Sequence, residues 1–130
     1  MQPEPSEIDS QGGVRSGLLR ASALFGLFGV ALGAFGAHGL EKVIEDPERL
    51  ATWDTAVFYH LVHAVMLYVM AVGGILRRRA WWTMACGVTV FSGSLYVLVL
   101  SGVSWLGAIT PIGGVLLLLG WGMLVVRPPR

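Results

Sequence analysis

The sequence contains long stretches without any charged residue. No Asp, Glu, Lys or Arg occurs within Ala21–Leu40, Thr55–Leu76 or Ala80–Val126. Over the 130 residues, charged residues make up only 13% and hydrophobic residues 55%. A typical soluble domain carries about 25% charged residues, so this composition excludes an ordinary soluble domain. We therefore expect an integral membrane protein.

The low numbers of cysteines and of basic residues exclude further classes of protein. Cys86 is the only cysteine, so the chain has neither an intramolecular disulfide nor a cysteine-based metal site. The net charge is only +1, and no basic arm is interleaved with aromatic residues, which excludes a nucleic-acid partner. The uncharged stretches also lack the buried carboxylate on which many proton-coupled cation exporters depend.

The lengths of the uncharged stretches predict four membrane spans. A hydrocarbon core of about 30 Å requires roughly 20 helical residues, so the first two stretches hold one span each and the third holds two. We expect an all-α polytopic membrane protein whose four transmembrane helices pack as a small bundle. The predicted spans are about residues 17–39, 55–76, 80–100 and 106–126. Pro111 is interpreted as a kink, because a helix that starts there would be only about 24 Å long.

Both ends of the chain lie outside these spans. Residues 1–16 are polar and rich in proline, glycine and acidic residues, which predicts a disordered tail, and residues 127–130 form a short second tail. Seven of the nine basic residues flank the spans on the side of the termini: Arg15, Arg20, Arg77, Arg78, Arg79, Arg127 and Arg130. Because basic residues are enriched on the cytoplasmic side, we expect cytoplasmic termini and insertion in the inner (plasma) membrane.

Small residues indicate where the helices pack. Gly26, Gly29, Gly33 and Gly36 recur every three or four residues, which places them on one face of the first helix. Such a face lets two backbones approach closely in lipid. We expect it to contact another helix of the same chain rather than a second copy. Ser94 and Pro111 are the corresponding candidates in the last two spans.

The three histidines form the candidate functional cluster. His38 ends the first predicted span, and His60 and His63 lie near the start of the second. In a simple hairpin His60 is roughly 7 Å and His63 roughly 12 Å below the level of His38, so all three lie toward one membrane face. Tyr59 and Asp54 border this region and complete the cluster.

These residue types are compatible with several roles. We favour hydrogen bonds between helices, the usual role of polar side chains within spans. The alternatives are a proton relay or solute path, a metal site completed by Asp54 or Glu41, and a haem held between His38 and His63. No tight ligand motif is present, so we assign no catalytic residue, metal ligand or cofactor.

Four ordered segments carry a family resemblance. They are LGAFGAHGL (32–40), WDTAVFYHLVHAV (53–65), FSGSLYVLVLSG (91–102) and LGAITPIGGVLLLLGW (106–121). They resemble the signature segments of DUF423, a bacterial family of unknown function related to the eukaryotic transmembrane protein 256. The resemblance implies a small four-helix membrane protein with no established activity. It singles out Gly33, Gly36, His38, Gly39, Trp53, Tyr59, His63, Ser92, Ser94, Tyr96, Thr110, Pro111 and Gly114, with His60 less constant.

We therefore expect a non-enzymatic accessory or interaction component of the membrane. Its partners would be the lipid bilayer and either a second copy of the chain or another membrane protein. The alternatives are a small oligomeric transporter or channel whose histidines line a polar path, and a metal or haem binder.

Overall fold

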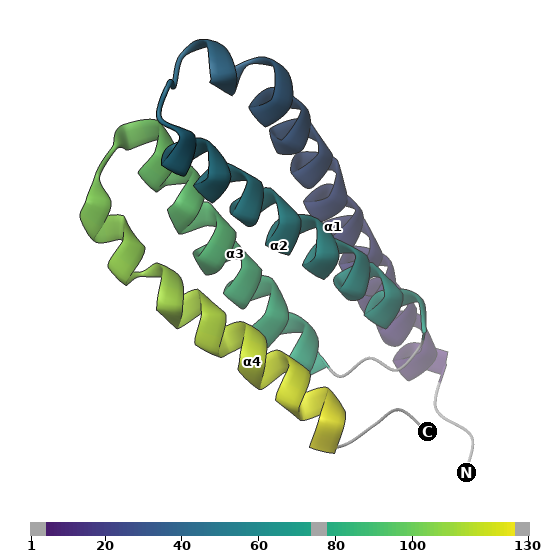
Figure 1. Cartoon of the computed structure of the whole chain (residues 1–130). Coiled ribbons are helices and arrows are strands. Elements are labelled where there is room, and N and C mark those ends of the chain that lie inside the picture. The colour runs from purple at the N-terminus through teal and green to yellow at the C-terminus, as the bar shows by residue number, and fades with distance from the viewer. Residues whose placement is uncertain (1–4, 74–77, 127–130) are drawn as a thin grey trace.

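Four long helices make up most of the chain in the computed structural model, which describes residues 5–73 and 78–126 (Figure 1). They are α1 (Pro5–His38), α2 (Pro47–Val72), α3 (Arg78–Ser101) and α4 (Thr110–Val126). The short 3-10 helices η1 (Leu40–Lys42) and η2 (Ser104–Ala108) lie in two of the connections. The described residues contain no strand.

The helices pack mainly in the order of the chain: α1 on α2, α2 on α3, and α3 on α4. The helices α1 and α4 therefore lie on the outer sides, and α1 begins at the end of the molecule where α4 ends (Figure 1). Four segments are long and apolar enough to cross a membrane: Ser10–Lys42, Pro47–Val72, Arg78–Ser101 and Ser104–Val126. The all-helical architecture with four apolar spans agrees with the prediction from the sequence.

The first two helices begin earlier than predicted. Because α1 starts at Pro5, residues 5–16 are helical, and the expectation of a disordered tail is wrong for this part; residues 1–4 and 127–130 lie outside the described residues. Proline is favoured at the first position of a helix, where no backbone donor is needed. The helix α2 starts at Pro47 because the Asp46 side chain accepts a hydrogen bond from the Glu48 backbone N–H at 3.0 Å.

The last span is not one kinked helix that begins near Leu106. It consists of η2 followed by α4, and Pro111 is the second residue of α4. Proline is tolerated there because the first turn of a helix has no partner for its backbone N–H groups. The preceding Thr110 is tied to α3, since its hydroxyl lies 2.7 Å from the hydroxyl of Ser94.

A glycine and an arginine shape the end of α3. Gly102 adopts a φ of 72°, which favours glycine, and its N–H donates to the Leu98 carbonyl at 2.8 Å. The guanidinium of Arg49, from the first turns of α2, donates to the carbonyl of Val99. A cation is favourable at the carboxyl end of a helix, so this contact joins α2 and α3.

Two apolar clusters form the core. The cluster nearer the start of α1 contains Leu18, Leu67, Met70, Ala71, Ala80, Trp81, Met84, Ala85, Val88 and Leu117. The cluster nearer the start of α2 contains Leu40, Ile44, Trp53, Ala56, Leu95, Tyr96 and Val99. Along α2 and α3, the buried polar residues His60, His63 and Ser92 fall between the members of these two clusters. They therefore lie near the middle of the helix pair.

Candidate functional site: polar side chains between the helices

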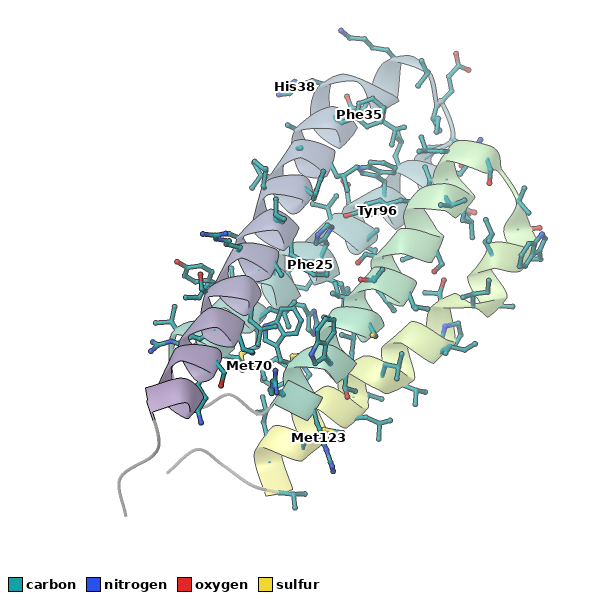
Figure 2. All side chains as sticks on the ribbon, turned by 180° about the vertical axis from the view of Figure 1, so that it is seen from behind. Phe25, Phe35, His38, Met70, Tyr96 and Met123 are labelled. Atoms are coloured by element: carbon teal, nitrogen blue, oxygen red, sulfur yellow. The ribbon has the colours of Figure 1, made fainter. Side chains whose placement is uncertain are left out.

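His60 lies where three helices meet. It is only 8% exposed, and its Nδ1 lies 3.0 Å from the hydroxyl of Tyr96 on α3. Its ring is nearly perpendicular to that of Phe25 on α1, with ring centroids 6.0 Å apart. Figure 2 labels Phe25 on α1 and Tyr96 on α3. His60 therefore connects α2 to both of its neighbours.

The absence of a side chain at Gly29 lets Leu61, next to His60 on α2, approach α1 closely. A Cβ atom at this position would lie 3.4 Å from Cδ2 of His60 and 2.7 Å from Cδ2 of Leu61. The second ring nitrogen of His60, Nε2, is buried and makes no hydrogen bond of good geometry. The backbone of Phe25 on α1 lies beside the ring. The ring is thus enclosed by the protein on both sides.

His63 uses both of its ring nitrogens within the protein. Nδ1 lies 2.7 Å from the carbonyl oxygen of Tyr59, which can only accept, so Nδ1 carries the proton. Nε2 then accepts a hydrogen bond from the indole N–H of Trp121 on α4 at 3.2 Å. This arrangement fixes the neutral tautomer and joins α2 to α4. It leaves no nitrogen of His63 free for a metal or a haem iron.

The candidate cluster is therefore only partly assembled. Tyr59 and His63 contact each other with nearly parallel rings 6.1 Å apart. His60 instead faces Tyr96, while Asp54 is exposed. His38 is exposed at the end of α1 and points away from the other helices (Figure 2).

The expectation that all three histidines lie toward one membrane face, with His60 and His63 only roughly 7 Å and 12 Å below His38, is wrong. Because α2 begins at Pro47, His60 and His63 follow its start by about 20 Å and 24 Å along the axis, near mid-span. His38, in contrast, is the last residue of α1. Among the side chains that the structure describes, no group of three or more His, Cys, Asp or Glu residues could hold a metal ion.

The glycine face of α1 lies mostly against α2. Added Cβ atoms at Gly29, Gly33 and Gly36 would contact Leu61, Val57 and Trp53, respectively, at 3.2 Å or less. Gly26 has nothing within 4 Å of such an atom, so it does not share this contact.

Of the other packing candidates, Ser94 contacts Thr110 across the α3–α4 interface. Pro111 is exposed.

Comparison with known proteins identifies the family. The model of the DUF423 family, described as a protein of unknown function, matches residues 32–114. The chain belongs to this family. The match includes all three histidines but ends before Trp121.

Relatives in the DUF423 family occur in bacteria and in fission yeast. A UPF0382 membrane protein of Bacillus subtilis, YwdK, is 46% identical over 112 residues, covering 80% of this chain and 89% of the relative. A UPF0382 membrane protein of Schizosaccharomyces pombe is 38% identical over 112 residues, covering 81% of this chain and 95% of the relative. No solved structure matches. Membership of this family makes the chain a multi-pass membrane protein of unknown function.

Several residues that tie the helices of this family member were not in the predicted cluster. The hydroxyl of Ser92 donates to the Ala56 carbonyl at 2.8 Å. The indole N–H groups of three tryptophans find acceptors on neighbouring helices: Trp53 at Leu32 O, Trp81 at Ser22 Oγ and Leu67 O, and Trp121 at His63. The signal for these contacts is chemical, since an indole N–H in an apolar span requires an acceptor.

Proposed function

We propose that this protein is a non-enzymatic component of the membrane that acts through contacts with other membrane proteins. The observation that carries the proposal is the pair of hydrogen bonds made by His63. Nδ1 is bonded to the α2 backbone at Tyr59 and Nε2 to Trp121 on α4, so the residue best suited to proton or metal chemistry serves the packing of the helices.

The other polar side chains within the spans support the same role. The contacts of His60 with Tyr96, Ser92 with Ala56 and Ser94 with Thr110 each join two helices. Hydrogen bonds between transmembrane helices contribute about 0.6 kcal/mol each on average. Together they stabilise one arrangement of the helices. The outer spans, which contain α1 and α4, remain largely uncovered, since only 17% of the most apolar stretch of each is buried. These two helices offer surfaces for another membrane protein.

We also propose that both termini face the cytoplasm, in the inner or plasma membrane. The support is the distribution of basic residues along the sequence, seven of which flank the predicted spans on the side of the termini. A reporter fused after Arg130 should be modified by cytoplasmic enzymes and protected from a membrane-impermeant reagent applied to intact cells. Labelling of that reporter from outside would contradict this orientation.

The three histidines give a direct test of the structural role. We expect His60→Ala and His63→Ala to lower the thermal unfolding temperature of the protein in mild detergent, because each leaves a polar partner unsatisfied. His38→Ala serves as the matched control and should leave the unfolding temperature unchanged, since His38 is exposed. Equal destabilisation by all three substitutions would contradict the assignment.

A transport role makes the opposite prediction. If His63 lined a solute path, His63→Ala would abolish a pH-dependent flux in proteoliposomes while the unfolding temperature stayed unchanged. This result would overturn the proposal in favour of a small transporter or channel.

A further inference from the structure

Four exposed arginines gather at the end of the molecule where α1 begins. Arg15 and Arg20 lie on α1, and Arg78 and Arg79 open α3. The two helices are held together here because the indole N–H of Trp81 donates to the hydroxyl of Ser22 at 3.2 Å.

Apolar packing and a contact with α2 also hold α1 in place here. Leu18 and Trp81 belong to the same apolar cluster. Arg15 also donates to the carbonyl of Val72 at the end of α2, at 2.6 Å. We call the four residues Arg15, Arg20, Arg78 and Arg79 the arginine corner.

The charges of the chain are strongly asymmetric between its two ends. All carboxylate side chains that the structure describes lie at the opposite end: Glu41, Glu45, Asp46, Glu48 and Asp54. Only Lys42 and Arg49 oppose them there, which leaves that end with a formal charge of −3. At the arginine corner the structure describes four arginine side chains and no carboxylate side chain.

Aromatic and apolar side chains continue from the arginine corner toward the middle of the helices. Trp82 is 57% exposed, and its ring lies nearly perpendicular to that of Trp81, with centroids 5.0 Å apart. Exposed tryptophans of this kind sit at the level of the lipid headgroups. One to two turns beyond Arg20, α1 presents the exposed side chains of Leu24 and Leu27. The surface thus changes from cationic to apolar in the same order as a phospholipid changes from phosphate to acyl chain.

We propose that the arginine corner binds the phosphate groups of anionic phospholipids. Guanidinium groups pair with phosphate oxygens through two parallel hydrogen bonds, which favours arginine at such sites. Clusters of four to eight basic residues next to a transmembrane helix typically recognise anionic lipids. A soluble anion would use the arginines alone, whereas a lipid also uses Trp82, Leu24 and Leu27. The proposal depends neither on the orientation in the membrane nor on the role of the histidines.

Lipid titration of the purified protein in detergent tests this proposal. Native mass spectrometry would measure the binding of phosphatidylglycerol and, separately, of phosphatidylcholine to the full chain. We expect phosphatidylglycerol to bind about tenfold more tightly, and we expect Arg78→Gln and Arg79→Gln each to weaken its binding about fivefold. Lys42→Gln is the matched control, because it removes one positive charge at the other end, and it should change the binding less than about twofold.

The remaining outcomes are also decisive. Equal binding of the two lipids, or equal weakening by Lys42→Gln, would overturn the proposal. Displacement of phosphatidylglycerol by millimolar inorganic phosphate would assign the corner to a soluble anion instead. Arg20→Gln provides a second variant on α1, and the unfolding temperature in lipid-free detergent verifies that each variant is folded.

Discussion

Replacing Gly113 with alanine should destabilise the protein by about 1–3 kcal/mol, because the backbone of α3 lies directly against this residue of α4. An added Cβ atom would lie 2.7 Å from the Cα of Phe91 and closer still to its backbone nitrogen. Backbone atoms cannot rotate away as a side chain can, so the two helices must separate. The free energy of unfolding, measured by titration with a denaturing detergent in mixed micelles, provides the readout.

Gly122→Ala is the matched control on the same helix. A Cβ atom there meets nothing within 4 Å. Alanine favours a helix over glycine by about 1 kcal/mol, so the control should be neutral or slightly stabilising. If Gly113→Ala were equally harmless, the close crossing of α3 and α4 would be wrong.

Gly36→Ala should destabilise the contact between α1 and α2 by a similar amount, about 1–3 kcal/mol. The added Cβ atom would lie 2.6 Å from both Cδ1 and Nε1 of Trp53. The indole cannot move aside easily, because it is 1% exposed, donates to the Leu32 carbonyl at 3.0 Å and packs on Tyr96 with centroids 4.7 Å apart. Unfolding free energies of the purified variants would measure the effect.

A second substitution shows whether the two residues are coupled. Trp53→Phe removes the indole nitrogen that the new methyl group would meet, although it also removes a hydrogen bond. The double variant should therefore lose less stability than the sum of the two single variants, by about 0.5 kcal/mol or more. Gly26→Ala serves as the control on α1, because nothing lies within 4 Å of its added Cβ. If the stability losses of the two single variants were strictly additive, the close packing of Trp53 against Gly36 would be contradicted.

The spans were predictable because the absence of charge over about 20 residues has a direct physical meaning in a bilayer. The helix boundaries were less predictable, since polar residues outside the membrane can still be helical. The capping by Asp46 and the proline that follows it extend α2 well beyond its apolar stretch. Pro111 is locally acceptable either at a kink within a helix or in the first turn of a helix. The structure has it in the first turn, and the short helix η2 before α4 supplies the rest of the length of the span.

The candidate site was harder to predict because its members depend on helix depth and on partners distant in sequence. Starting α2 at Pro47 rather than near Thr55 moves His60 and His63 toward mid-span and away from His38. Spacing within α2 placed the two histidines near one another. It could not indicate that one would meet Tyr96 and the other Trp121, which lie 36 and 58 residues away along the chain.

The most direct test of the proposed structural role is a double-mutant cycle on His63 and Trp121. The cycle compares the unfolding free energies of the wild type, His63→Ala, Trp121→Phe and the double variant, and so isolates the interaction between the two side chains. The hydrogen bond between α2 and α4 predicts a coupling of about 0.6–1.7 kcal/mol. A coupling of zero would show that His63 does not hold these helices together and would contradict the structural role assigned to it.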